Sequence, residues 1–345
     1  MSSSVGSTKK MLNADKENSV PPFFISGDNG CDMGSEKKKK KLKKKNLGSL
    51  KNALDLDPVV AGLKLWELSD NESAPASSWS ILNNRSLLCK PLPLDIGRCT
   101  CIIVKEKIEG FKRLVSLYSL YTSEGQGRQD RKLAVAWHRR RCNGRSEFFI
   151  AMNPNGILSR SEDNFLGTIT SNLMGSKYQI WDQGRASQSP KRRRVNLLGV
   201  VAFAPTISTW MGNFRRITTW LPKNDQSLQL KNTTQIQHIK GLPKDWSLKT
   251  TRSQKIFSKI PFYNNVQKRY ELDFRERAPG RTELRIQPSV KNFQLSIDEN
   301  GNQLILQLGK IGKSKYVMDF RYPLTGYQAF CICLSSIDSK LCCAV

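Results

Sequence analysis

The segment that most constrains the fold lies near the carboxyl terminus, where residues 324–334 read LTGYQAFCICL. Almost every position is apolar or small, so a helix through this segment has no polar face and must be buried. Eleven residues are too few to cross a bilayer, and Asp338 and Lys340 follow closely. We therefore expect a helix enclosed by protein, with Phe330, Ile332 and Leu334 in the core.

The sequence that precedes this helix predicts the sheet that encloses it. From about residue 91, short apolar or alternating runs are separated by turn residues, which is typical of strands. The expected strands are 101–104, 114–121, 133–137, 147–151, 178–181, 197–203, 217–221, 270–274, 292–297, 304–308 and 316–320. We predict a mainly β domain over residues 91–345, a closed antiparallel barrel of about twelve strands threaded by its own carboxy-terminal helix. Residues 1–90 are polar, without a sustained period, and are expected to form a disordered basic tail.

The charge of the chain predicts an anionic partner. Lys and Arg number 56 and Asp and Glu 29, a net charge of +27. Residues 1–95 hold 15 basic and 11 acidic residues, a net of +4, so residues 96–345 hold the remaining 41 and 18, a net of +23. Most of the excess therefore belongs to the predicted barrel, where basic groups have fixed positions and can select the shape of an anion.

Several function classes are disfavoured by the same composition. Nine scattered cysteines lack a C-x-x-C pair, which suits neither a disulfide framework nor a zinc site, and His138 and His238 are the only histidines. No catalytic motif and no apolar run of membrane-spanning length is present. We expect a monomer that is not an enzyme and has no metal, no cofactor and no transmembrane segment.

Four segments resemble the tubby family: residues 171–178 (SNLMGSKY), 288–295 (PSVKNFQL), 318–324 (MDFRYPL) and 328–341 (QAFCICLSSIDSKL). The resemblance runs from about Arg98 to the carboxyl terminus. It implies a twelve-stranded antiparallel barrel around a central helix, in agreement with the pattern above. Plant members usually carry an F-box ahead of the barrel, and no F-box-like stretch precedes it here. The chain thus looks like a plant-type tubby-like protein without an F-box.

The resemblance also implies a binding site for phosphatidylinositol 4,5-bisphosphate, made by two basic residues at positions i and i+2 of one strand. These positions fall on Arg139 and Arg141, with Arg145 within reach from the following loop and Arg140 on the opposite face towards solvent. Residues i and i+2 project from one face about 6.6–6.8 Å apart, which suits two phosphates. The alternative is that these arginines are solvated strand residues. Further basic residues of the family are replaced by Thr168 and Thr170.

Two other basic runs are candidate nuclear-localisation signals. One includes Lys37, Lys38, Lys39, Lys40 and Lys41, and the other is Lys191, Arg192, Arg193 and Arg194 after Pro190. The alternatives are a solubilising tail and a solvated loop. An import receptor would read such runs in an extended chain.

We therefore expect a phosphoinositide-binding module tethered to the cytoplasmic face of the plasma membrane, with a nuclear signalling or transcription-regulatory role. The alternatives are a basic protein that binds nucleic acid without specificity and an interaction scaffold with little lipid selectivity. A basic surface has salt-dependent affinity for any polyanion, but no helix is evident that would enter a major groove.

Overall fold

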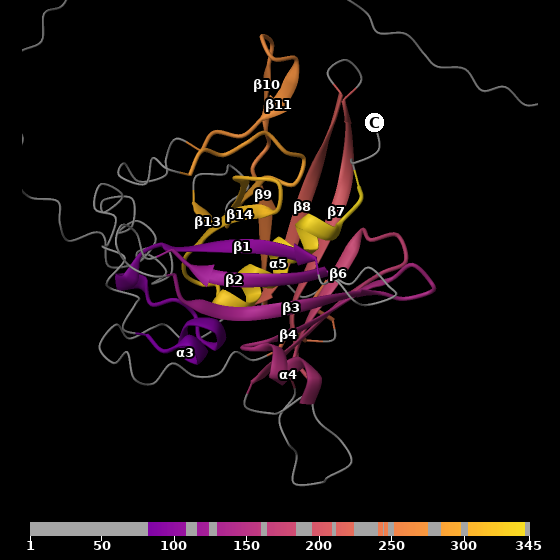
Figure 1. Cartoon of the computed structure of the whole chain (residues 1–345). Coiled ribbons are helices and arrows are strands. Elements are labelled where there is room, and N and C mark those ends of the chain that lie inside the picture. The colour runs from indigo at the N-terminus through magenta and orange to yellow at the C-terminus, as the bar shows by residue number, and fades with distance from the viewer. Residues whose placement is uncertain are drawn as a thin grey trace, which may run out of the picture. The chain divides into compact units, whose positions relative to one another are not determined.

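The computed structural model describes residues 82–107, 116–123, 130–159, 164–183, 195–208, 212–223, 241–243, 245–247, 252–274, 284–297 and 303–341. All of them belong to one compact unit, Ala53–Val345. Within these ranges twelve strands close into an antiparallel barrel in the order β1-β14-β13-β12-β9-β8-β7-β6-β5-β4-β3-β2 (Figure 1). The predicted barrel is confirmed.

Neighbouring strands of the barrel follow one another in the sequence, and two small elements, a hairpin and a short helix, are inserted between them. They are β1 Cys99–Lys107, β2 Ser116–Thr122, β3 Lys132–Arg140, β4 Ser146–Ala151, β5 Phe165–Ser171, β6 Lys177–Asp182, β7 Leu197–Ser208, β8 Gly212–Pro222, β9 Ser253–Ser258, β12 Phe293–Ser296, β13 Leu304–Lys310 and β14 Lys315–Phe320. The strands β10 Phe262–Asn264 and β11 Arg269–Glu271 pair only with each other, as a separate hairpin. The short helix α4, Pro154–Ser159, follows β4.

The carboxy-terminal helix α5, Gly326–Asp338, runs inside the ring of strands (Figure 1). Its 13 residues span about 20 Å. Phe330, Ile332 and Leu334 are fully buried, which confirms their predicted place in the core. A capping box closes its first turn, because the Thr325 hydroxyl accepts from the Gln328 amide at 3.0 Å and the Gln328 side chain accepts from the Thr325 amide at 3.2 Å.

Polar side chains on this buried helix form hydrogen bonds with the barrel wall or within the helix. The Tyr327 hydroxyl donates to the Trp181 carbonyl at 2.6 Å, and the side-chain Nε2 of Gln328 donates to the Leu198 carbonyl at 3.0 Å. Ser335 donates back to the Cys331 carbonyl one turn earlier. A helix with no solvent face is stable here because its few polar side chains all find partners.

A short helix, α3 (Asn84–Cys89), packs on the amino-terminal end of α5. Leu87 and Leu88 are buried in the main core, and a Cβ added at Gly326 would lie 2.8 Å from the Leu87 carbonyl oxygen. The two helices therefore approach so closely that only glycine fits at this position. The barrel core thus receives residues that precede residue 91, where the sequence places the start of the domain.

One strand prediction differs from the structure, and two barrel strands were not predicted. Residues 270–274 were expected in the main sheet, but the strand there, β11, belongs to the hairpin outside the barrel. β5 and β9 are barrel strands that the sequence pattern does not indicate, because FLGTITS and SQKIFS have few apolar residues and no regular alternation. None of the helices in the described parts of the chain has the length and apolar character that a membrane span requires.

Candidate anion-binding site on the barrel wall

The arginine run lies where β3 ends, and the alternation of the strand divides it between two faces. His138 stacks on Phe148, a residue of the main core, with ring centroids 4.4 Å apart. Its neighbour Arg139 has its guanidinium 5.8 Å from the ring centroid of Phe149, which belongs to a smaller apolar cluster outside that core. Successive side chains of a strand point to opposite faces. Arg139 therefore lies on the outer face of the wall and His138 on the inner face.

Arg139 and Arg141 converge on one carboxylate, that of Glu147 in β4. Arg141 donates from Nε to Oε2 at 3.0 Å and from an Nη to Oε1 at 2.8 Å, a bidentate pair. Arg139 lies 3.4 Å from Oε2 and directly opposite Glu147 in the strand pairing. The Glu147 side chain is only 9% exposed, whereas both arginine side chains are about half exposed, at 52% and 51%. The hydrogen bonds that Arg141 donates to Glu147 raise the pKa of Arg141.

Arg145 is on the same turn but is not brought to this carboxylate. Its backbone closes the turn, since its carbonyl accepts from the Arg141 amide at 2.9 Å and its amide donates to the Asn143 side chain at 3.1 Å. Gly144, at φ +82°, supplies the left-handed conformation that the turn needs. The Arg145 side chain is exposed and has no hydrogen bond or ion pair with any residue in the described ranges.

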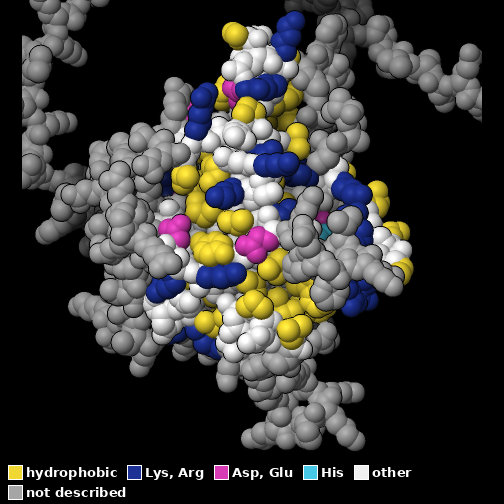
Figure 2. Space-filling model, in the orientation of Figure 1, with side chains coloured by type: hydrophobic (Ala, Val, Ile, Leu, Met, Phe, Trp, Pro, Cys, Tyr) yellow, Lys and Arg dark blue, Asp and Glu magenta, His cyan; other side chains and the backbone are white. Residues whose placement is uncertain are grey.

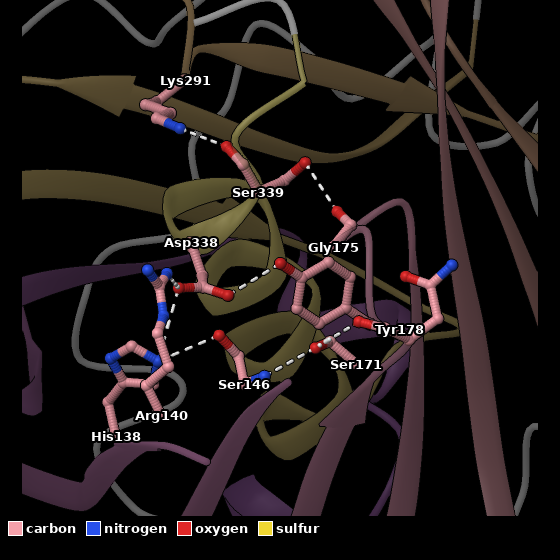
Figure 3. A network of polar contacts seen from close by, with 10 residues as sticks. His138, Arg140, Ser146, Ser171, Gly175, Tyr178, Lys291, Asp338 and Ser339 are labelled. Carbon is pink, nitrogen blue, oxygen red and sulfur yellow. Dashed lines mark hydrogen bonds and ion pairs between the residues drawn. The ribbon is translucent and has the colours of Figure 1, made fainter. Parts of the chain in front are cut away.

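On the inner face, Asp338 at the end of α5 is the centre of a polar network (Figure 3). The Tyr178 hydroxyl donates to it at 2.7 Å, and His138 Nε2 and an Arg140 Nη lie 3.4 Å and 3.7 Å from it. Arg140 was expected to face solvent. It does lie on the face opposite Arg139 and is half exposed, but it also pairs with this buried carboxylate. Three consecutive arginines thus serve two separate contacts.

Burial lowers the pKa of His138, an effect that the charge of Asp338 opposes and the charges of Arg140 and Lys105 reinforce. Burial, and then the charge of Asp338, raise the pKa of Tyr178 far above its ordinary value. The phenol therefore stays protonated and donates to the carboxylate. The contacts of Asp338 with Tyr178, His138 and Arg140 tie the end of α5 to β6 and β3.

The same end of α5 is tied to the turns that carry the candidate site. The Ser339 hydroxyl donates to the Gly175 carbonyl at 3.1 Å, in the turn between β5 and β6 (Figure 3). The Ser146 amide donates to the Ser171 hydroxyl at 2.7 Å and so joins the β3–β4 turn to the same region. Lys291 donates to the Ser339 carbonyl, which places a cation at the negative end of the helix dipole. The end of the central helix thereby holds the β5–β6 turn, and the start of β4 is joined to the end of β5.

The two threonines that replace basic residues of the family lie on the same outer surface. Thr170 is directly opposite Glu147 in the β4–β5 pairing, and its hydroxyl accepts from the Trp181 indole at 3.2 Å. Thr168 lies opposite Phe149. Neither supplies a charge, so the described basic side chains at Glu147 are Arg139 and Arg141 alone.

Sequence reasoning missed the two carboxylates. Glu147 could have been found, because a strand that folds back after a turn at residues 141–145 places Glu147 beside Arg139. Asp338 had no local signal, since Tyr178 is 160 residues away in the chain. The candidate import runs, Lys37, Lys38, Lys39, Lys40, Lys41 and Lys191, Arg192, Arg193, Arg194, lie outside the described residues.

Comparison with known proteins agrees with this architecture. Residues 88–339 match the profile described as the Tub family. The chain is 64% identical over 285 residues to Tubby-like protein 4 of Oryza sativa subsp. japonica, covering 81% of this chain and 67% of that protein. It is 57% identical to Tubby-like protein 8 of Arabidopsis thaliana, with 83% and 71% covered, and 28% identical to human Tubby-related protein 1, with 79% and 48% covered.

Proposed function

Because the chain belongs to the Tub family, we propose that it is a phosphoinositide-binding module that docks on the cytoplasmic face of the plasma membrane. The observation that carries the proposal is the convergence of Arg139 and Arg141 on a single carboxylate at the outer wall of the barrel. No catalytic step is part of it.

The geometry at Glu147 supports an anion site of this kind. Two guanidiniums already reach one oxyanion from the same side, at 2.8 Å and 3.4 Å. A phosphate group presents the same acceptor atoms as a carboxylate and more charge, so it competes for the same donors. Because the guanidiniums are about half exposed, an incoming head group can reach them without unfolding the turn.

A vesicle-sedimentation assay tests the assignment. Arg139→Ala/Arg141→Ala should reduce binding to vesicles that contain phosphatidylinositol 4,5-bisphosphate by at least about tenfold, since two charge-assisted contacts are removed. Arg269→Ala is the matched control, because Arg269 pairs with Glu271 at 2.7 Å on the separate β10–β11 hairpin and is similarly exposed. If the double variant binds as well as the wild type does, the assignment is wrong.

Selectivity decides between this function and generic polyanion binding. Binding of the wild type to the phosphoinositide, to phosphatidylserine vesicles and to duplex DNA should be compared at one salt concentration, because all three depend on ionic strength. A preference for the inositol head group supports the proposal. Equal affinity for all three would favour the nucleic-acid-binding or scaffold alternative.

A nuclear signalling or transcription-regulatory role is the second part of the proposal, and the two lysine- and arginine-rich runs support it. The expected result is that a fluorescent fusion of the full chain loses nuclear accumulation when Lys191, Arg192, Arg193 and Arg194 are changed to Ala. A second variant carries the same change to Ala at Lys37–Lys41. If the nuclear signal persists in both variants, the role of these runs is refuted.

A further inference from the structure

The turn between β5 and β6 displays two large apolar side chains to solvent. Leu173 is 62% exposed and Met174 is 76% exposed. They occupy the two central positions of a turn closed by a hydrogen bond from the Gly175 amide to the Asn172 carbonyl at 3.2 Å. Turns of this kind usually place polar residues or glycine there. An apolar pair at the tip of a turn therefore suggests a surface that leaves water when the protein functions.

This turn is held rigidly in its exposed conformation. The Asn172 side chain accepts from the amides of Ser176 and Lys177, at 2.9 Å and 3.1 Å, and donates to the Ser176 hydroxyl at 2.8 Å. Gly175 adopts φ +64°, and its carbonyl accepts from Ser339 beyond the end of the central helix. Because the backbone is fixed at both sides, the two apolar side chains stay at the tip.

The apolar turn lies beside the arginine turn. A Cβ added at Gly144 would be 3.8 Å from Leu173 Cδ1, so the two turns are close neighbours. At the right-hand edge of Figure 2, hydrophobic and basic side chains adjoin over the turns that follow β3 and β5. We call Leu173 and Met174, together with Arg139, Arg141 and Arg145, the apolar–basic tip.

We infer that Leu173 and Met174 enter the interfacial layer of an anionic phospholipid bilayer while the neighbouring arginines bind its head groups. This inference rests on the proposed function and deepens it. The occupant is argued from complementarity: in a bilayer a sheet of negative phosphate directly overlies apolar chains, and the tip presents cations directly beside apolar side chains. The carboxylates near the tip, Glu147 and Asp338, are buried and paired with cations, so they do not repel such a surface.

Leu173 and Met174 would provide a second membrane anchor beside the arginines. This second anchor also explains how a modest head-group site can hold a protein at a membrane. A single weak anchor gives marginal, reversible attachment, whereas two anchors on one surface act together. The arginines recognise the head group, and the apolar pair adds affinity that is specific to a bilayer. A head group free in solution offers nothing to Leu173 and Met174, so the two contributions are separable by experiment.

The test compares the full chain with Leu173→Ser/Met174→Ser. Partition onto phosphatidylcholine vesicles that contain phosphatidylinositol 4,5-bisphosphate should fall about tenfold, equal to about 1.4 kcal/mol. Affinity for soluble inositol 1,4,5-trisphosphate, measured by calorimetry, should stay unchanged. Leu158→Ser is the matched control, because Leu158 is 78% exposed on α4, beyond the opposite end of β4 from the arginine turn. It should bind vesicles as the wild type does, and Leu173→Met/Met174→Leu should retain the partition.

The remaining outcomes separate this inference from the proposed function. Wild-type partition by the double Ser variant would overturn the inference, would leave head-group binding intact and would point to a protein partner for the tip. A parallel loss of soluble head-group affinity would also overturn it, because the turn would then belong to the pocket. If the wild type ignores the inositol head group but binds phosphatidylserine vesicles and loses this binding in the double variant, the proposed function fails and the insertion stands. Binding to neither vesicle overturns both.

Discussion

Replacing Glu147 by Gln should strengthen the binding of an anionic head group, because the carboxylate already occupies the two guanidiniums that the head group needs. The substitution keeps the shape of the side chain and one acceptor oxygen, so the turn should remain folded. It removes the negative charge that lies 2.8 Å from Arg141 and 3.4 Å from Arg139. A head group then no longer has to displace or share a resident anion.

The size of the effect follows from the exposure of the arginines. Both guanidiniums are about half exposed, so solvent screens their attraction to Glu147 as it does for a surface ion pair. Such pairs typically change an equilibrium constant by about 1.4-fold to 5-fold. With two pairs released, we expect affinity for soluble inositol 1,4,5-trisphosphate to rise about twofold to 25-fold.

Calorimetric titration at low and at high salt provides the assay, and the gain should shrink as salt screens the charges. Glu271→Gln is the matched control, because it removes the carboxylate of another arginine pair on the β10–β11 hairpin and should leave the affinity unchanged. A fall in affinity for Glu147→Gln would refute the reasoning. The carboxylate would then be needed to hold the arginines in position for the ligand.

Three further outcomes are expected. Thr170→Arg, which adds one cation directly opposite Glu147, should raise head-group affinity about 1.4-fold to 5-fold by the same titration, and unchanged affinity would mean that Thr170 is outside the site. Phe330→Ala should lower the free energy of unfolding by about 3–5 kcal/mol in denaturant titration, whereas Val290→Ala, at an exposed position, should change it by less than about 0.5 kcal/mol. A small effect at Phe330 would contradict the enclosed helix. Burial lowers the pKa of His138 in the folded state, so the unfolded chain takes up this proton at a higher pH than the folded protein does. The contribution of His138 to the free energy of unfolding is therefore complete above the ordinary pKa of 6.5 and is lost as pH falls from 6.5 towards the lowered folded-state pKa. His138→Gln should therefore lose less unfolding free energy than the wild type below pH 6.5, and an equal loss would exclude His138 as the cause.

The barrel and its central helix were predictable because one segment left no alternative. Residues 324–334 have no polar face, so only an enclosing sheet could accommodate Phe330 and its neighbours. Strands rich in β-branched and aromatic residues, such as β1 and β14, followed from their pattern. β5 and β9 did not, because each has only two or three apolar residues, interrupted by Gly, Ser, Thr, Gln or Lys, which is too few to establish a period.

At the candidate site, the sequence predicts correctly that Arg139 and Arg141 share a face, since side-chain direction in a strand has a period of two. It did not predict what they contact. The bidentate pair with Glu147 depends on the cross-strand register, and the pair between Arg140 and Asp338 depends on where the last turn of a distant helix comes to rest. Whether the two outer arginines bind a phosphoinositide stays a prediction.

Because the three arginines divide between two faces of the strand, each must keep its odd or even position along the chain. The number of basic residues matters less than which face each one occupies. Removing or adding one residue ahead of Arg139 would send the outward cations towards the carboxylate of the core and turn Arg140 outward, since a shift of one position exchanges the two faces of a strand. A change of two residues would restore the same sides. Insertions of even length in this part of β3 should thus be tolerated more readily than those of odd length, even where every basic residue is retained.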